Sequence, residues 1–174
     1  MTDPSTTLLR PLTATDAESF SALRRAVTAD NPVPMGLTLE EELTRPLQGF
    51  RDQLSSPPPN AAFGAFDGDA LVGCAALAWP SKFASSRHKT TLWGTFVAPS
   101  HRRQGIARAL VQRIIAHARE HGVRRVNLLV YLPNPQAVGL YASLGFVACG
   151  LEPEAICLDG RFHDGQHMSL LLAT

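Results

Sequence analysis

Residues 97–110 read VAPSHRRQGIARAL, and most of what the sequence indicates about function depends on this stretch. Two adjacent arginines, a glutamine and a glycine stand directly before a segment with apolar residues at helical spacing. A helix N-terminus leaves about four backbone N–H groups without intrahelical partners and carries roughly half a positive charge, so anions bind there. Gly105 lets a ligand approach the backbone, and Arg102 and Arg103 add forked donors. We therefore expect a pyrophosphate site at the start of this helix.

A strand precedes this stretch, and a second strand follows its helix. Residues 90–97 are β-branched and aromatic, and residues 104–121 carry apolar side chains four positions apart. Gly122 is a typical helix end, and residues 125–132 are mostly apolar, as in a parallel strand covered on both faces. The unit is predicted to be a right-handed parallel β-α-β crossover.

The remaining elements are read from caps, turns and apolar spacing. Before the crossover we expect a short loose tail, a strand in 7–12 and a helix after the capping box 13–16. A second helix should run from the capping box at 38–41 to about residue 54, kinked or restarted at Pro46. Two strands joined at 67–69 and a loop over 81–88 should follow. After it we expect a helix over 134–145 and strands over 146–158 and 162–172. This order predicts one α/β domain over residues 1–174, with a mixed, mostly antiparallel sheet, a central parallel crossover and helices on both faces.

Composition limits the function. The chain has 174 residues, 45% of them hydrophobic and 18% charged, which suits one domain with a sizeable core. A formal net charge of +1 gives no general attraction to nucleic acid or acidic membranes. No apolar run reaches the roughly 18 residues of a membrane span, and no basic segment followed by an apolar one opens the chain. We therefore expect a cytoplasmic protein.

Cysteine spacing indicates free thiols. Cys74, Cys149 and Cys157 are odd in number and lack a CxxC pattern. We expect them to be buried and unpaired in a reducing compartment.

Histidine spacing gives two pairs and no complete metal site. His117 and His121 are four apart in the predicted long helix. His163 and His167 share that spacing in a predicted strand, where such residues lie far apart. No third ligand is evident for either pair, so we expect no metal.

A second block strengthens the interpretation of the first. Residues 134–146 read NPQAVGLYASLGF, one strand beyond the predicted long helix. The two blocks together resemble the GNAT superfamily of acyl-CoA-dependent N-acyltransferases. The first is similar to its motif V-x-P-x-x-R-x-x-G-x-[GA], and the second to its segment N-x-x-A-x-x-x-Y-x-x-x-G-F.

The resemblance implies a site for acyl-CoA. Its first strand usually bears a β-bulge, and Phe96 and Val97 would offer backbone groups to the pantetheine arm and the thioester. An N–H donor there would stabilise the developing oxyanion by roughly 3–4 kcal/mol. The pyrophosphate would be held by six residues: Arg102, Arg103, Gln104, Gly105, Ile106 and Ala107.

Two residues of the second block take roles by the same resemblance. Asn134 would reach the pantetheine or adenosyl side, although a plain helix cap explains it nearly as well. Tyr141 would point its hydroxyl at the CoA sulfur. A phenol with a pKa near 10 can protonate a leaving thiolate, while the alternative is a core tyrosine.

No residue is identified as the base. Many relatives use a glutamate on the strand before the motif, but here that strand reads KTTLWGTFV and contains no carboxylate. Glu40, Glu41 and Glu42 are better explained as a solvated acidic first turn of a helix. The remaining candidates are weaker: Glu152, Glu154 and His163.

We expect the protein to transfer an acetyl group from acetyl-CoA, or another short acyl group from its acyl-CoA, to an amine without a metal. The acceptor is a small-molecule amine or a peptide amine, with no nucleic-acid or membrane partner, and a homodimer through the last strands is left open. Candidate linings of the acceptor pocket are Trp79, Trp93, Phe83 and the loop 31–34, although strand aromatics are more often core. One alternative is a catalytically inactive acyl-CoA-binding module. Another is an interaction protein whose arginines (102, 103, 108, 113) bind phosphate.

Overall fold

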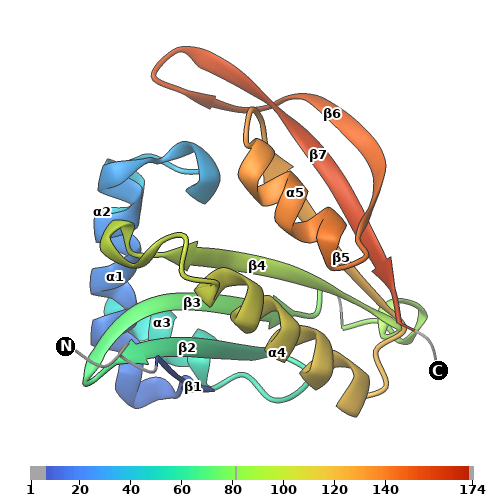
Figure 1. The fold of residues 1–174 in the computed structure, drawn as a ribbon, viewed down its shortest axis with the longest axis horizontal. Helices are drawn as coiled ribbons and strands as arrows, with labels where there is room; N and C mark the ends of the chain where they lie inside the picture. The colour runs from blue at the N-terminus through green and yellow to red at the C-terminus, as the bar shows by residue number, and fades with distance from the viewer. Residues whose placement is uncertain (1–6, 81, 173–174) are drawn as a thin grey trace.

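The computed structural model describes residues 7–80 and 82–172. The tail expected before residue 7 and Ser81 of the expected loop lie outside this range. One sheet runs through the described chain in the order β1-β2-β3-β4-β5-β7-β6 (Figure 1). Its strands are β1 (Leu8–Pro11), β2 (Ala61–Asp67), β3 (Ala70–Ala78), β4 (Lys89–Val97), β5 (Arg125–Tyr131), β6 (Val147–Leu158) and β7 (Arg161–Leu171).

Helices connect these strands in the predicted order. They are α1 (Ala17–Asp30), α2 (Leu39–Thr44), α3 (Leu47–Leu54), α4 (Ile106–Glu120) and α5 (Pro135–Ser143), with short 3-10 turns η1 (Ala14–Asp16), η2 (Val33–Met35), η3 (Ala84–Ser86) and η4 (Pro99–His101). The expected break at Pro46 separates α2 from α3, because proline lacks the N–H that a continuing helix needs. All neighbouring strands pair antiparallel except β4 and β5, which confirms the mixed, mostly antiparallel sheet.

Helices cover both faces of the sheet, as predicted. Apolar residues of α4 and α5 pack with one face of β2 to β5 in one buried cluster. On the other face, α1 and α3 pack against β2, β3 and β4 around Phe20, Phe50 and Phe96 (Figure 1). The sheet therefore separates two hydrophobic cores, and the face to which a side chain of β4 points decides which core it joins.

The last two strands form a long arm at the edge of the sheet. Most of β6 is exposed, and it pairs only with β7 among the described strands. The expectation of three buried thiols is therefore wrong for Cys149 and Cys157, which lie exposed on β6. Cys74 on β3 is buried, and burial raises the pKa of its thiol.

None of the helices within residues 7–80 and 82–172 combines the length and apolar character needed to cross a membrane.

Candidate active site

The central parallel pair opens along its length. β4 pairs with β5 only from Lys89↔Arg125 to Thr91↔Asn127. Beyond Thr91, β4 keeps its pairing with β3 while its path diverges from β5 (Figure 1). We call Lys89–Thr91 the closed half of β4 and Leu92–Val97 its open half. The open half presents to the β5 side a strand edge whose backbone groups have no ladder partner there.

A bulge bends the open half. Ala76 of β3 pairs with Trp93 and Cys74 pairs with Phe96, so two residues of β4, Gly94 and Thr95, oppose one residue of β3. Gly94 has a φ of 62°, which a glycine adopts without strain. An extra residue of this kind bends a strand and redirects its side chains. The bulge that the family resemblance implies is therefore present.

The N-terminus of α4 follows the open half. Gly105 is the N-cap residue with a φ of 79°, and no side chain caps the helix there. A Cβ at this position would meet nothing within 4 Å, and the backbone of Arg103 is also left-handed, with a φ of 64°. The first N–H groups of a helix have no intrahelical partner. The predicted anion site thus has its backbone donors and the space beside them.

Arg102 joins this helix start to two other elements. Its Nε donates to the carbonyl of Val97 at 3.2 Å, and its Nη2 lies 2.8 Å from Oδ2 of Asp30 at the end of α1. Two further arginines are also engaged, Arg108 with Ser143 and Arg113 with Glu120. Three of the four arginines (102, 108 and 113) thus take part in the fold's own contacts, which weakens the alternative of a free phosphate-binding stripe.

Asn134 acts as the cap of α5. Its Oδ1 accepts a hydrogen bond from the backbone N–H of Ala137 at 3.1 Å, and Pro135 takes the first helical position. The plain helix-cap interpretation is therefore confirmed as geometry. A contact between Asn134 and CoA stays a prediction.

Tyr141 reaches from α5 to the bulge of β4. The side chain is 8% exposed, and its ring packs edge-on against Phe146 with 5.6 Å between centroids. Burial raises the pKa of Tyr141, and the hydroxyl of Thr95 in the open half lowers it by a smaller effect. Thr95 Oγ1 is itself buried and makes no hydrogen bond of ordinary geometry to the described residues. A protonated phenol and a spare hydroxyl thus meet at the opening between β4 and β5.

The acidic turn of α2 is only partly solvated. Glu40 is exposed and Glu41 caps the helix, its carboxylate accepting from the N–H of Thr38 at 2.8 Å. Glu42 is 0% exposed, and Arg24 of α1 donates to both its oxygens at 2.7 and 2.9 Å. The expectation of a solvated turn is wrong for Glu42, which is a buried ion-pair partner rather than a free base.

The weaker base candidates lie on the β6–β7 arm. Glu152 pairs with His167 at 2.9 Å, and Glu154 is exposed on the same strand. His163 Nδ1 lies 3.0 Å from the carbonyl of Leu132. None of these contacts joins Tyr141, so a base at the opening is not identified among the described residues.

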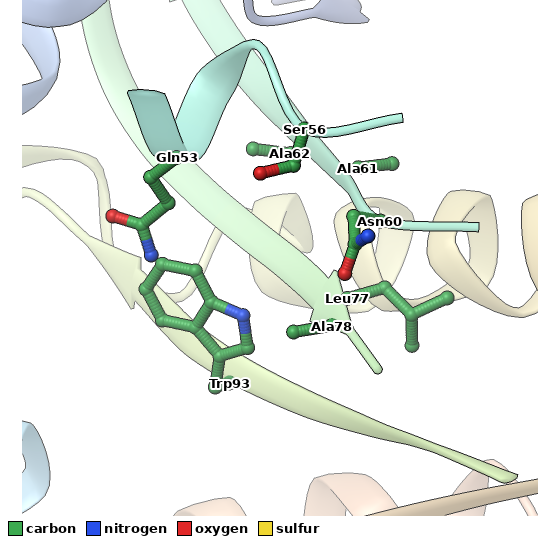
Figure 2. A pocket seen from close by; sticks show the side chains of 8 residues that line it. All are labelled: Gln53, Ser56, Asn60, Ala61, Ala62, Leu77, Ala78 and Trp93. Carbon is green, nitrogen blue, oxygen red and sulfur yellow. The ribbon is translucent and has the colours of Figure 1, made fainter. Parts of the chain in front are cut away.

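The aromatic candidates for the acceptor pocket do not gather. Trp93 lines a cavity of about 60 Å³ between α3 and the β2–β3 pair (Figure 2). This cavity is far smaller than the roughly 300 Å³ of a small-molecule site, and Trp93 packs with the α1–α3 core, across the sheet from Tyr141. Trp79 donates to the carbonyl of Arg87, and Phe83 is 78% exposed.

One aromatic residue beside the opening was missed from the sequence. Tyr131 ends β5, and Gly36 of the α1–α2 connection lies against its ring. A Cβ at position 36 would stand 2.5 Å from Cε2 of Tyr131. The proline-containing loop 31–34 therefore leads to the end of β5, a contact that no local pattern could have indicated.

The two histidine pairs differ as predicted, with one addition. His163 and His167 of β7 contact different partners, the carbonyl of Leu132 and the carboxylate of Glu152. The rings of His117 and His121 stack at the end of α4, 4.1 Å between centroids, and Glu120 adds a third potential ligand that the sequence reasoning overlooked. Burial is the largest cause that lowers the pKa of His117.

A sheet that opens between two parallel strands, with Gly105 at the adjoining helix start and a buried tyrosine beside the opening, is the arrangement that the family resemblance implies. The profile of the acetyltransferase (GNAT) family matches residues 21–146, which is most of the chain. The protein therefore belongs to the GNAT family.

Individual relatives agree with this assignment. Streptothricin acetyltransferase of Streptomyces lavendulae is 35% identical over 106 residues, covering 61% of this chain and 52% of that protein. Spermidine N(1)-acetyltransferase of Vibrio cholerae is 32% identical over 85 residues, covering 48% of this chain and 49% of that protein. The chain spans about half the length of these two curated relatives.

Solved structures show the same fold. A GNAT acetyltransferase from Streptococcus pneumoniae superposes with a TM-score of 0.81 at 24% identity, over 95% of this chain and 99% of that one. A phosphinothricin acetyltransferase from Sinorhizobium meliloti, in complex with AcCoA, superposes with a TM-score of 0.82 at 22% identity, over 96% of this chain and 89% of that one.

Proposed function

We propose that this protein transfers an acetyl group from acetyl-CoA to an amine by direct attack in a ternary complex. The observation that carries the proposal is the meeting of Tyr141 with the bulged, unpaired edge of β4, beside the uncapped N-terminus of α4. The names of its relatives support this chemistry, because they describe acetylation of streptothricin and of spermidine. A fold neighbour that carries AcCoA supports the choice of donor.

The residues at the opening fit acetyl-CoA. The N–H groups of the segment Arg102–Ala107 would hold the pyrophosphate, and open space at Gly105 leaves room for it. The edge at Phe96 and Val97 would pair with the extended pantetheine arm, as an exposed strand edge pairs with an added chain. Asn134 would contribute from the start of α5.

Tyr141 would act as the acid. Acetyl-CoA supplies an activated thioester, and the departing sulfur needs a proton when the amine takes the acyl group. Because burial raises the pKa of Tyr141, its hydroxyl is protonated at neutral pH and able to donate. A backbone N–H of Phe96 or Val97 would stabilise negative charge on the carbonyl oxygen. No base is assigned, and the amine would lose its proton through water.

The acceptor would enter at the end of the opening that Tyr131 and the loop at Gly36 border. An amine-bearing small molecule or a peptide amine is the proposed class. A single domain, a cytoplasmic location and a homodimer stay predictions.

Isothermal titration calorimetry tests the donor site. The purified protein is titrated with acetyl-CoA, desulfo-CoA and ATP. Saturable micromolar binding of the two CoA compounds, without binding of ATP, is the expected result. No heat from any CoA compound would refute the proposal.

Tyr141→Phe tests the chemistry. The variant should bind acetyl-CoA within about threefold of the parent, but with an accepted amine its turnover should fall by about 100-fold. Thiol release in an amine panel that includes spermidine measures turnover. Donor binding without turnover for any amine would favour the inactive binding module.

A further inference from the structure

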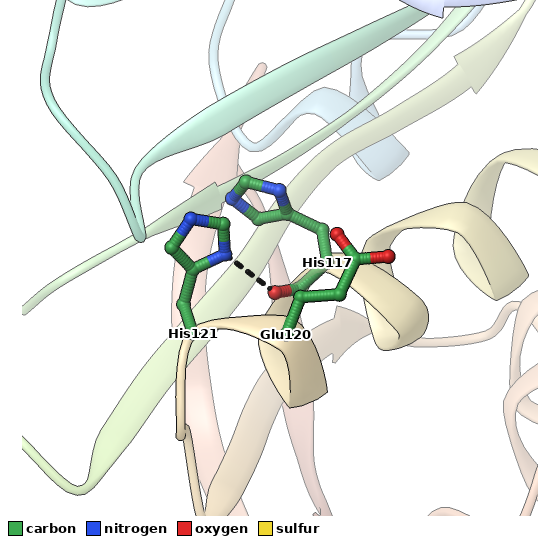
Figure 3. Close-up of side chains that lie close together, drawn as sticks. All are labelled: His117, Glu120 and His121. Carbon is green, nitrogen blue, oxygen red and sulfur yellow. Dashed lines mark hydrogen bonds between the residues drawn. The ribbon is translucent and has the colours of Figure 1, made fainter.

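The last turn of α4 carries three potential metal ligands far from the acyl-transfer opening. His117, Glu120 and His121 are spaced i, i+3 and i+4, which places them on one helix face. Each offers one ligand atom, and these atoms lie within 4.8 Å of one another (Figure 3). We propose that this turn binds a divalent transition-metal ion that favours imidazole, such as Zn²⁺.

Both imidazoles are held by backbone carbonyls. Nε2 of His117 lies 3.2 Å from the carbonyl oxygen of Pro59. Nδ1 of His121 lies 2.9 Å from the carbonyl oxygen of His117, a contact that Figure 3 shows as a dashed line. A carbonyl only accepts, so in each neutral ring the bonded nitrogen carries the proton and the other keeps its lone pair. Hydrogen bonds of this kind fix the tautomer of metal-binding histidines.

The rigidity of the three ligands differs. His117 is 9% exposed and packs edge-on against Phe63, with 5.6 Å between centroids. Glu120 and His121 are exposed and reach solvent. Zinc bonds of about 2.0–2.2 Å in a tetrahedron hold ligand atoms about 3.4 Å apart, a spacing that the two exposed side chains can reach by small rotations from within 4.8 Å. Three protein ligands leave a fourth position for water.

Some charges at this site favour a bound cation and one opposes it. The C-terminal end of a helix is negative and favours a cation, and Glu120 adds a carboxylate. Against this, Nη1 of Arg113 lies 3.3 Å from Oε1 of Glu120, and its guanidinium stacks on Phe63 at 4.7 Å from the ring centroid. The metal must therefore take Glu120 from Arg113, which makes micromolar rather than tight binding the expectation.

Calorimetry of the untagged chain with zinc chloride tests the proposal. The parent should bind Zn²⁺ saturably with one-to-one stoichiometry, and His121→Ala should weaken that binding by at least about tenfold. Glu120→Gln should weaken it less. The matched control is His167→Ala, an exposed histidine that also faces a glutamate, and it should leave the affinity unchanged. Absence of saturable binding, or equal binding by His121→Ala and the parent, would overturn the proposal.

Arg113→Gln gives a test of opposite sign. Removing the competing cation should tighten Zn²⁺ binding by about threefold or more, whereas a merely structural role for the histidines predicts no change. Weaker binding by this variant would contradict the assignment of Glu120 as a ligand. Zinc binding is measured without acetyl-CoA or an amine, so its outcome is independent of the proposed acyl transfer.

Discussion

The two halves of β4 share one strand and differ in their neighbours. The closed half, Lys89–Thr91, pairs with β5, and Thr91 also pairs with β3. The open half, Leu92–Val97, keeps β3 but lacks β5 and contains the bulge at Gly94 and Thr95. The closed half therefore acts as scaffold, and the open half exposes backbone groups that a ligand can pair with. The candidate site therefore arises where the β4–β5 hydrogen-bond ladder ends, more than from any single side chain.

The largest effect should come from the ion pair that supports the open half from outside. Arg24 is bound to Glu42 and lies 5.8 Å from the ring centroid of Phe96. Glu42→Ala leaves a buried arginine unpaired, so it should lower the free energy of unfolding by about 3–5 kcal/mol. Urea denaturation measures this loss. Glu40→Ala, on the exposed side of the same helix, should stay within about 0.5 kcal/mol of the parent, and an equal cost for both would contradict the burial of the pair.

The two glycines that flank α4 allow the effect of ligand binding to be distinguished from that of backbone strain. Gly105 and Gly122 have φ values of 79° and 68°, and a Cβ at either meets nothing within 4 Å. Valine at either position should strain the backbone by a similar amount, about 1–3 kcal/mol. Only Gly105→Val should weaken acetyl-CoA binding, by about 10- to 100-fold, because it shifts the donors beside the open half.

Calorimetry and thermal unfolding of the two glycine variants are compared side by side. Equal losses of acetyl-CoA affinity in Gly105→Val and Gly122→Val would show that helix strain, not anion contact, controls binding.

Two threonines compare the halves of β4 directly. Thr90 in the closed half holds a buried hydroxyl oxygen without a hydrogen-bond partner in the described chain, whereas the buried hydroxyl of Thr95 in the open half interacts with Tyr141 and lowers its pKa. Thr90→Val should stabilise the fold by up to about 1 kcal/mol and leave turnover unchanged. Thr95→Val should raise the pKa of Tyr141 further and slow turnover by about threefold to tenfold. Unfolding temperatures and turnover rates of the two variants test these expectations. A loss of turnover in Thr90→Val, with none in Thr95→Val, would contradict the distinction between the two halves of β4.

The smallest effect is expected beside β1, at the edge of the sheet far from the open half of β4. A hydrogen bond from Arg10 is the largest cause that lowers the pKa of Asp16 below 3.8, and the N–H of Thr13 adds to it. A carboxyl whose folded-state pKa is depressed stabilises the fold above its unfolded pKa, and that contribution is lost as pH falls through the folded value. Asp16→Asn should therefore cost about 1 kcal/mol at pH 7.

Denaturation of parent and Asp16→Asn over a pH series measures the difference. It should vanish well below pH 3.8, while acetyl-CoA binding at neutral pH stays the same. A difference that persists in acid would contradict the role of the carboxylate charge.

Local signals in the sequence predicted the order of elements. The capping boxes at Thr13 and Thr38, the break at Pro46 and the cap at Asn134 all act within a few residues, so the sequence displays them. Gly105 and Tyr141 were likewise found through short motifs. Their positions beside one opening follow from the parallel pairing that the crossover required.

Contacts between distant segments could not be predicted. Glu42 reads as a solvated helix turn until Arg24, on another helix, is placed against it. Cys149 and Cys157 read as buried thiols because the sequence does not show that β6 lies at the sheet's edge. Thr95 meets Tyr141 only because α5 folds back toward β4. Each of these depends on how elements distant in the sequence pack together, which no local pattern contains.

The contact between Gly36 and Tyr131 limits how descendants of this chain can diversify. Position 36 has a φ of 72° and no room for a Cβ beside Tyr131, so a substitution there strains the backbone even if Tyr131 also changes. Its neighbours in the α1–α2 connection carry no such constraint from glycine geometry. Sequence variation beside the end of β5 would therefore accumulate at the neighbouring positions of the α1–α2 connection, while Gly36 stays fixed against the ring of Tyr131.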